Sequence, residues 1–187
     1  MNRRRKRSVS DRSGVVVIGS GFGGFFAARR FRRLQVDVTM LAATDSFLYA
    51  PLLPDVAVGT VDPRSVLIPL ASTLPGTRIL RGQADLVDLN SRTVHYTDAR
   101  GERAQLGYRR LLLAPGSVTR LLPISGLAEH AIGLKTATEA MYLREKVLAQ
   151  MEAANTMTEA AQRREALTFV VVGAGYAGVE LTAQMAE

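Results

Sequence analysis

The chain has 187 residues, of which 47% are hydrophobic and 22% are charged, as is typical of a soluble globular protein able to bury a core. The absence of cysteine excludes zinc–thiolate sites, iron–sulfur clusters and a redox-active disulfide. Much of the net charge of +7 comes from the basic run 3–7. We interpret this run as a solvated tail; attraction to anionic lipid is the alternative, and nucleic acid is disfavoured because no aromatic residues are interleaved.

A βαβ unit is predicted directly after the tail. Residues 14–18 form a short β-branched run between glycines, which predicts a buried strand. Residues 22–34 predict an amphipathic helix with Phe22, Phe25, Phe26 and Ala28 on one side and arginines on the other. Residues 36–41 predict a second strand, parallel to the first. No apolar run is long enough for a membrane span, and none follows the tail as in a secretory signal.

The middle of the chain is predicted to be irregular first and antiparallel afterwards. Five prolines within residues 42–76 favour short helical turns over regular elements. Antiparallel strands are expected at the next alternating segments, residues 77–88, 92–97 and 105–108. A separate apolar strand is expected at residues 111–114, before Pro115-Gly116.

The last third predicts a long helix and then a second strand–turn–helix. Thr136 and Glu139 form a capping box, which predicts a helix over residues 136–154. Its expected apolar stripe consists of Ala140, Leu143, Val147, Leu148 and Met151. Residues 168–172 predict another buried strand, and residues 177–187 the start of a helix.

Two glycine-rich turns of the form G-x-G-x-x-G lie about 154 residues apart, each between an expected strand and helix. In the first, Gly19 permits a tight turn, Gly21 lets a pyrophosphate approach the backbone, and Gly24 allows close packing of helix on strand. The N-terminus of the helix adds N–H groups and a positive dipole end. The second turn repeats these roles with Gly173, Gly175 and Gly178. The repeat therefore predicts two dinucleotide sites.

The first site lacks the acidic residue that normally binds the ribose hydroxyls about 20 positions after the glycines. The second strand is expected to end at Leu41, so this position is Ala42, whose side chain accepts no hydrogen bond. Asp45, three residues later, is the candidate replacement.

With these motifs the chain resembles the pyridine-nucleotide-dependent flavoprotein reductases, most closely the type II NADH dehydrogenases. The resemblance covers residues 14–187. It is carried by both glycine turns, by Phe47-Leu-Tyr-Ala-Pro-Leu-Leu-Pro54 with the following Val58-Gly59, by Leu111-Leu-Leu-Ala-Pro-Gly116, by residues 123–126 and by Glu180. It implies FAD and NAD(P)H as cofactors, with hydride passing from NADH through FAD to a membrane quinone without cysteine chemistry.

The resemblance also implies roles at matching positions. Pro51 would lie near the isoalloxazine ring, and the backbone of Ala84 would contact the adenine. Glu180 would lie near the flavin–nicotinamide stack, with an ordinary helix residue as the equal alternative. The implied FAD contacts are Gly19, Ser20, Gly21, Phe22, Gly23, Gly24, Asp45, Pro51, Ala84, Ala114, Pro115 and Gly116. The implied NAD(P)H contacts are Gly173, Gly175 and Gly178.

Three departures from the family pattern accompany these roles. Ala42 replaces the acidic ribose ligand, and Pro115 replaces a threonine, which removes a hydroxyl and a backbone N–H. Family members are also roughly twice as long, so the sequence predicts a truncated second nucleotide domain.

The expected fold is α/β: a Rossmann-like FAD-binding domain with a parallel sheet and a small antiparallel β insertion, plus the first βα unit of a second Rossmann domain. The expected division is a basic tail, the FAD-binding domain, a connecting helix and the start of the NAD(P)H-binding domain, at residues 1–13, 14–135, 136–166 and 167–187.

The expected function is NADH dehydrogenase-like oxidoreduction in the cytoplasm, at the inner face of the cell membrane in the full-length family. One alternative is a catalytically inactive remnant or FAD/ADP-binding module that needs a second chain. Another is a Rossmann protein that binds NAD alone. An unpaired 168–172 strand would promote self-association through its exposed edge.

Overall fold

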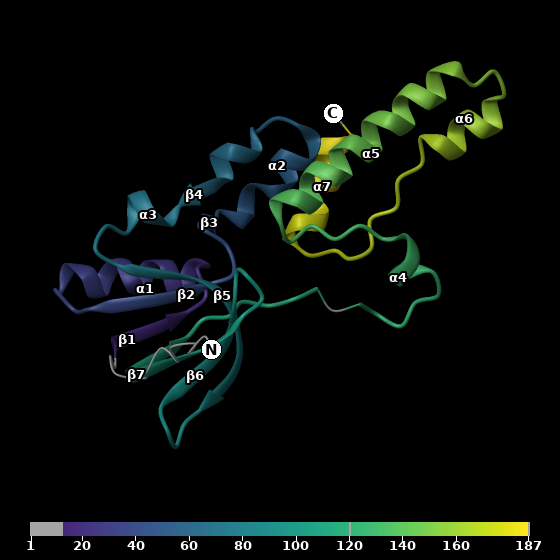
Figure 1. Cartoon of the computed structure of the whole chain (residues 1–187). Coiled ribbons are helices and arrows are strands. Elements are labelled where there is room, and N and C mark those ends of the chain that lie inside the picture. The colour runs from purple at the N-terminus through teal and green to yellow at the C-terminus, as the bar shows by residue number, and fades with distance from the viewer. Residues whose placement is uncertain (1–12, 120, 187) are drawn as a thin grey trace, which may run out of the picture. The chain divides into compact units, whose positions relative to one another are not determined.

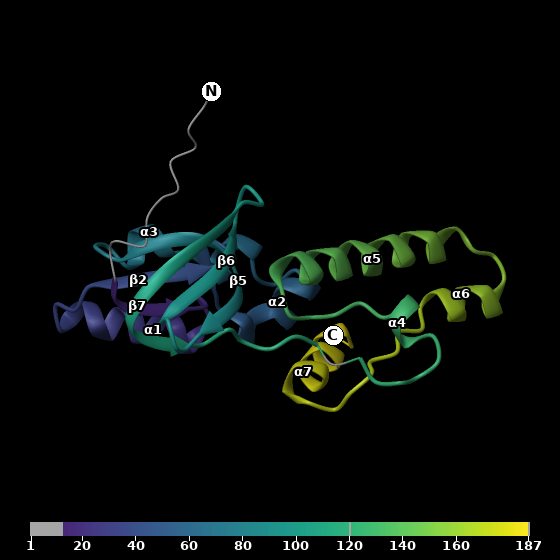
Figure 2. The same ribbon diagram turned by 60° about the horizontal axis from the view of Figure 1, so that its bottom comes forward.

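Five strands close into a ring in the order β1-β2-β5-β6-β7 in the computed structural model, which describes residues 13–119 and 121–186 (Figures 1 and 2). The pairs β1–β2, β1–β7 and β2–β5 are parallel, and β5–β6 and β6–β7 are antiparallel. The predicted mixture of a parallel sheet and a small antiparallel one is therefore confirmed. The strands are β1 (Ser13–Ile18), β2 (Val38–Ala42), β5 (Arg78–Asp88), β6 (Thr93–Asp98) and β7 (Arg103–Leu113).

Two long strands belong to both sheets and close the ring. The first residues of β5 pair with β2 and its later residues pair with β6. In the same way, β7 pairs first with β6 and then with β1. The prediction of separate strands at 105–108 and 111–114 was wrong, because β7 continues unbroken through Gly107, where its pairing passes from β6 to β1.

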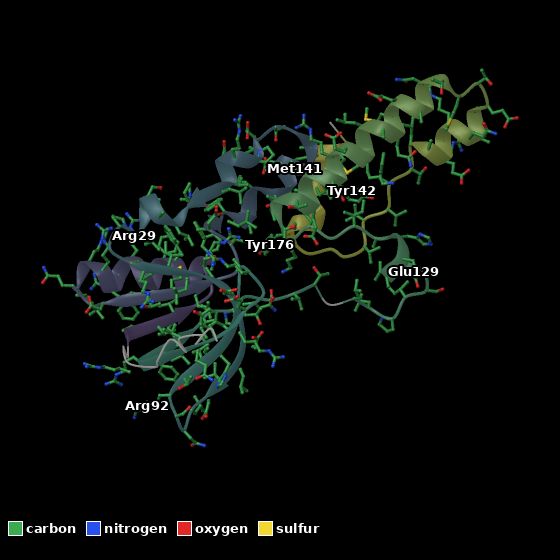
Figure 3. The ribbon with its side chains drawn as sticks, in the orientation of Figure 1. Arg29, Arg92, Glu129, Met141, Tyr142 and Tyr176 are labelled. Atoms are coloured by element: carbon green, nitrogen blue, oxygen red, sulfur yellow. The ribbon has the colours of Figure 1, made fainter. Side chains whose placement is uncertain are left out.

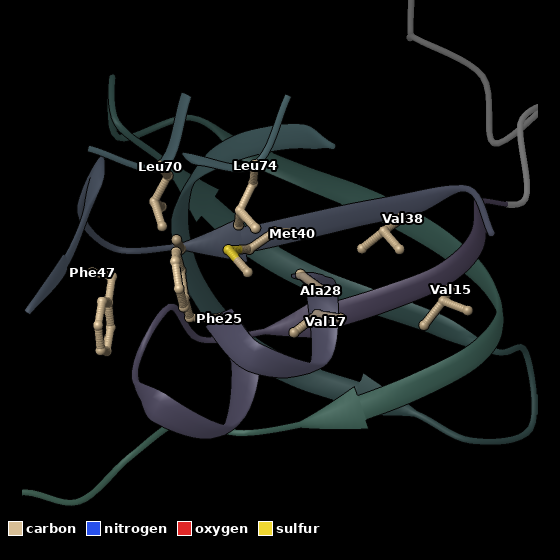
Figure 4. Close-up of a cluster of buried hydrophobic side chains, with 10 residues drawn as sticks. Val15, Val17, Phe25, Ala28, Val38, Met40, Phe47, Leu70 and Leu74 are labelled. Carbon is tan, nitrogen blue, oxygen red and sulfur yellow. The ribbon is translucent and has the colours of Figure 1, made fainter. Parts of the chain in front are cut away.

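Apolar residues of β1 face both sides, as the prediction of a buried strand requires. Val16 and Ile18 face the cluster inside the ring, whereas Val15 and Val17 pack toward α1 (Phe22–Arg33). Figure 4 shows the cluster that contains Val15 and Val17, which α1, β1, β2 and α3 (Leu70–Thr73) enclose. Its buried members are Val15, Val17, Phe25, Ala28, Val38, Met40, Ala42, Phe47, Leu70 and Leu74.

The buried side of α1 is narrower than predicted. Gly24, Phe25 and Ala28 are buried, but Phe22 and Phe26 are 43% and 49% exposed. Placing Phe22 and Phe26 on the covered side together with Phe25 was wrong, because the helical period puts positions 24, 25 and 28 on one face and rotates 22 and 26 toward solvent.

The chain divides into two compact units, one from Met1–Phe47 with Ile68–Ser117 and the other from Leu48–Leu67 with Val118–Glu187. The second unit is helical. Its core joins α2 (Leu53–Val58), α5 (Ala137–Thr156) and α7 (Tyr176–Met185). The buried residues are Leu53, Val56, Ala57, Val66, Ala140 and Leu181. The remaining short elements are β3 (Ser46–Leu48), η1 (Ala50–Leu52), η2 (Pro63–Val66), β4 (Leu67–Pro69), α4 (Leu127–His130) and α6 (Ala160–Ala166).

The capping box at the start of α5 is confirmed. The Thr136 hydroxyl oxygen accepts the Glu139 N–H at 3.1 Å, and the Glu139 carboxylate accepts the Thr136 N–H at 2.8 Å. The predicted stripe was partly wrong, because Leu148 and Met151 are 43% and 49% exposed. The fully buried positions of α5 are alanines, which let neighbouring helices approach closely. Figure 2 shows the unpredicted α6 folding back beside α5.

Residues 168–172 do not form the predicted buried strand. They have no regular secondary structure, and Val170 is 81% exposed. A strand needs a partner for its N–H and C=O groups, and none pairs with this segment among the described residues. The following helix forms nevertheless, because its hydrogen bonds are local.

Candidate functional site

The first glycine turn lies at the carboxyl edge of the parallel strands. Gly19 has a φ of +98° and donates its N–H to the carbonyl of Leu41 at 2.8 Å. Ala114 donates its N–H to Ile18 at 2.9 Å, and its own carbonyl oxygen would collide with a Cβ on Gly19. The structure therefore brings the predicted segments 19–24 and 114–116 together.

The three motif glycines of this turn have different reasons to be glycine. Gly19 needs its positive φ, and a Cβ on Gly24 would collide with the carbonyl oxygen of Gly19. Gly21 has an ordinary φ of −70°, and an added Cβ would meet nothing within 4 Å. The protein's own packing thus explains Gly19 and Gly24 but not Gly21.

The second turn shows the same pattern. Gly173 has a φ of +115°, and a Cβ on Gly178 would lie 2.6 Å from the carbonyl oxygen of Gly173. Gly175 has a φ of −76° and, like Gly21, open space where a Cβ would lie. Figure 3 marks this end of α7 by Tyr176, whose side chain projects into solvent and is 92% exposed.

Neither α1 nor α7 has a side-chain cap at its N-terminus. The N-cap residues are Gly21 for α1 and Gly175 for α7, and neither makes a side-chain capping hydrogen bond. Helix α5, in contrast, is closed by its capping box. A glycine N-cap supplies no side-chain acceptor of its own, and phosphate oxygens suit the positive dipole end of such a helix.

Ala42, which stands where an acidic residue was expected, is the last residue of β2, and Asp45, the candidate replacement, lies in the loop that follows. Ala42 is buried under α1, so it contributes no polar group to the site. Asp45 is exposed; one carboxylate oxygen accepts the Ser46 hydroxyl at 3.0 Å and the other lies 4.0 Å from the Arg81 guanidinium. The Ser20 hydroxyl donates to the Ser46 carbonyl at 3.3 Å, which ties this loop to the first glycine turn.

The remaining predicted site residues are divided between the two units. In the first, the Phe22 ring meets Phe47 edge-on with centroids 5.0 Å apart, and Ala84 is half-buried opposite Tyr96 in the β5–β6 ladder. In the second, Pro51 lies in η1, immediately before α2, and Glu180 is an exposed residue of α7.

The second unit joins the Pro51 segment to the second glycine turn, although more than a hundred residues separate them. Helix α2 packs against α7, and Gln184 Nε2 donates to Asp55 Oδ1 at 3.0 Å. Helix α2 ends at Gly59, which has a φ of +86°, and a Cβ there would lie 2.9 Å from the Arg144 guanidinium. Local patterns in the sequence gave no signal for the Asp55–Gln184 contact, because it depends on tertiary packing.

Carboxyl groups with altered pKa in the first unit lie in hairpin turns and not at the glycine turns. Hydrogen bonds from Ser91, followed by the N–H of Asn90, lower the pKa of Asp88. The N–H groups of Glu102 and Arg100 lower the pKa of Asp98.

In the described part of the chain no three acidic or histidine side chains are arranged to hold a metal, and no helix is long and apolar enough to cross a membrane.

Comparison with known families and proteins places these features in context. A profile described as pyridine nucleotide-disulphide oxidoreductase matches residues 13–187. The chain is 36% identical to the type II NADH:quinone oxidoreductase NdhA of Mycobacterium tuberculosis, covering 96% of this chain and 39% of that protein. It is 32% identical to the external alternative NAD(P)H-ubiquinone oxidoreductase B4 of Arabidopsis thaliana, covering 91% of this chain and 31% of that one.

Solved structures show the same fold. The NDH2 of Plasmodium falciparum, solved in complex with NADH, superimposes with a TM-score of 0.85 at 25% identity, covering 94% of this chain and 37% of that one. The same protein in complex with RYL-552 gives a TM-score of 0.87 with the same identity and coverage. The chain thus spans about two fifths of the length of its curated relatives.

Proposed function

The chain belongs to the pyridine nucleotide-disulphide oxidoreductase family, and from this premise we propose that it is an FAD-dependent NADH dehydrogenase module. The first glycine turn binds the FAD pyrophosphate, and the second binds that of NAD(P)H. Bound FAD would supply the redox chemistry, the acceptance of a hydride from NADH and the passage of two electrons to a quinone-type acceptor, which would take up two protons to become the quinol. The protein binds and orients both nucleotides.

One observation carries this proposal: the middle glycine of each turn is unexplained by the protein itself. Gly21 and Gly175 adopt ordinary backbone conformations, and an added Cβ would meet no atom within 4 Å at either position. A ligand that must approach the backbone closely accounts for both. Pyrophosphate is the ligand that this geometry and the uncapped helix N-termini suit best.

On this proposal the first unit holds the adenosine and pyrophosphate parts of FAD. Ser20 and Gly23 belong to the same turn, and the Ala114-Pro115-Gly116 segment beside it follows the cofactor. Phe22 covers the turn, and the Ala84 backbone meets the adenine. Asp45 supplies the ribose acceptor that Ala42 lacks, which its exposure and the Ser20–Ser46 hydrogen bond between its loop and the first glycine turn favour.

The second unit contributes to the reacting ends of both nucleotides. Pro51 lies near the isoalloxazine ring, the glycines at 173, 175 and 178 hold the NAD(P)H pyrophosphate, and Glu180 lies near the nicotinamide. The packing of α2 on α7 supports this assignment, because it places the Pro51 segment and the second turn in one structural body.

The chain's relatives suggest its acceptor and setting. Their names specify quinone or ubiquinone as the substrate. We propose that this chain acts in the cytoplasm at the inner membrane face, with an FAD-binding part that begins at residue 14 and an NAD(P)H-binding part that begins at residue 167.

The exposure of residues 168–172 favours a second candidate function, a nucleotide-binding module that becomes active with additional polypeptide. Val170 and Val172 are 81% and 53% exposed where a strand pairing with further strands would bury them. In isolation, this segment would promote self-association, which size-exclusion chromatography over a concentration series would detect.

A single substitution tests the pyrophosphate proposal. Gly21→Asp would add a cap to α1 and a negative charge beside the phosphates, so FAD and ADP affinity should fall more than about 100-fold while stability is retained. Equilibrium binding of FAD, followed by flavin fluorescence, measures this. Ala131→Asp, which adds the same charge at an exposed position with an ordinary φ of −78°, is the matched control. Unchanged FAD affinity in Gly21→Asp would contradict the proposal. A separate assay of NADH oxidation with a soluble quinone distinguishes the two candidate functions, because only the enzyme turns over without additional polypeptide.

A further inference from the structure

A polar contact joins the two segments that the proposed function places at the reacting ends of the nucleotides. Gln184 Nε2, near the end of α7, donates to Asp55 Oδ1 in α2 at 3.0 Å, across 129 residues of sequence. Asp55 follows Pro51 by one helical turn, and Gln184 lies on the helix that begins at the second glycine turn. The contact therefore bridges the flavin side and the pyridine-nucleotide side.

The Asp55 side of this contact is anchored. Its backbone carbonyl accepts the Thr60 N–H at 3.0 Å, the Thr60 hydroxyl at 3.1 Å and the Val61 N–H at 3.3 Å. These bonds close the end of α2 against the following loop. Helix α7 has no such closure at its start, because the preceding residues 168–172 are outside any sheet. Asp55 thus provides a fixed point for a less constrained helix.

The contact is poorly suited to a role in stability alone. The second polar atom of the Gln184 side chain, Oε1, is buried and has no hydrogen-bond partner among the described residues. The cost of burying an unpaired carbonyl matches or exceeds the gain from one hydrogen bond. An apolar side chain, such as the neighbouring buried Leu181, would pack there without this cost. A glutamine at this position is therefore better explained by the geometry that it imposes.

We propose that Asp55 and Gln184 are positioning residues for hydride transfer. They set the placement of α7, and with it the bound pyridine nucleotide, relative to the Pro51 segment of the same unit. This inference rests on the proposed function. It matters because the hydride donor and acceptor must approach to about 3–3.5 Å, and a misplacement of about 1 Å can lower the rate about 100-fold.

Three variants separate positioning from stability. Gln184→Met keeps the volume, removes the hydrogen bond and removes the unpaired carbonyl. Gln184→Glu places two carboxylates against each other, which repel. The double variant Asp55→Asn with Gln184→Glu restores one hydrogen bond with donor and acceptor exchanged. Gln150→Met, at an exposed position of α5, is the matched control.

The first measurement is anaerobic reduction of the FAD-loaded chain by NADH. Gln184→Met and Gln184→Glu should each lower the limiting reduction rate between about 10- and 100-fold, whereas ADP-ribose affinity changes less than about threefold, because the glycine turn remains intact. The double variant should recover most of the rate. Gln184→Met should melt no lower than the unmodified chain. Wild-type rates in both single variants would overturn the inference, as would a well-folded double variant that recovers nothing.

The second measurement needs no cofactor. Because the chain has no cysteine, spin labels can be attached at Ala183→Cys on α7 and Glu145→Cys on α5, both exposed positions. Their distance distribution should be narrow in the wild-type background and the double variant, and broader in both single variants; equal widths would overturn the inference. A wild-type flavin that NADH does not reduce would instead contradict the proposed function, and the spin labels would still test whether the pair fixes α7.

Discussion

The two glycine turns carry the same sequence motif, but only the first follows a strand. Val16 precedes the first turn and is fully buried in a strand paired on both sides, whereas Val170 precedes the second turn and is 81% exposed. The following helices form in both cases. The comparison shows that a β-branched run forms a strand only when partner strands are available, whereas a helix satisfies its backbone hydrogen bonds within its own segment.

The turns also differ in how firmly their first glycine is held. Gly19 lies against the carbonyl of Ala114 and donates a hydrogen bond to β2. Gly173 has open space on the corresponding side. The first turn is therefore fixed in the fold before any ligand binds, and the second is held mainly through α7.

The largest expected effect comes from the third glycine of each turn. Gly24→Ala should destabilise the first unit by about 3 kcal/mol, because its new methyl group meets a backbone carbonyl that the sheet holds in place. Gly178→Ala should also destabilise, by about 1–2 kcal/mol, because its methyl group would meet the backbone carbonyl of Gly173 at the longer distance of 2.6 Å. Native-state hydrogen exchange of β1 and α7 amides measures each unit separately. Equal costs would show that the second turn is as rigid as the first.

The valines before the turns should give the next largest difference. Val16→Ala removes two buried methyl groups and should cost about 2 kcal/mol, whereas Val170→Ala should change stability by less than about 0.5 kcal/mol. Urea denaturation of both variants checks this. A substantial loss in Val170→Ala would mean that residues 168–172 are buried in solution, as self-association would produce.

Capping provides a smaller test. Thr136→Ala should lower the stability of the second unit by about 1 kcal/mol, because α5 depends on its capping box. Ser20→Ala, next to the uncapped start of α1, removes only an exchangeable 3.3 Å hydrogen bond and should cost less. Thermal melting followed by circular dichroism measures both. A larger loss in Ser20→Ala would indicate that the first turn needs its own side-chain support.

Local patterns predicted most elements of the fold, including the β1–α1–β2 unit, the antiparallel insertion and the α5 capping box. Their success has a physical reason: periodicity, capping and turn residues act over a few positions. Pairing at a distance was not predictable in this way. The passage of β7 from β6 to β1, and the absence of partners for residues 168–172 in the described part of the chain, depend on which strands the whole chain supplies.

The candidate site likewise contains some features that local sequence predicts and others that depend on tertiary packing. The glycine turns could be found from the sequence, because each glycine acts on its own backbone or on a close ligand. The network around Asp45 required the structure, since Ser20, Ser46 and Arg81 meet only after β2 and β5 pair. The Asp55–Gln184 contact required it even more, because α2 and α7 approach only through the helical core.

Acid titration extends the comparison to the two units, with the smallest expected effect. Hydrogen bonds from Arg64, first from its side chain and then from its backbone, lower the pKa of Asp62 from 3.8 to about 2. Because the folded-state pKa lies below the unfolded one, this carboxylate stabilises the second unit above pH 3.8, and the contribution is lost as the pH falls toward 2. Asp62→Asn should therefore melt slightly below the unmodified chain at neutral pH, and this difference in melting temperature should disappear on acidification.

Arg64→Gln should return the Asp62 pKa toward 3.8 in a carboxyl-detected NMR titration. A difference in melting temperature that widens in acid would contradict the stabilising role assigned to the Asp62 carboxylate. A change in the hydrogen-exchange protection of the β1 amides would show that the effect lies in the first unit.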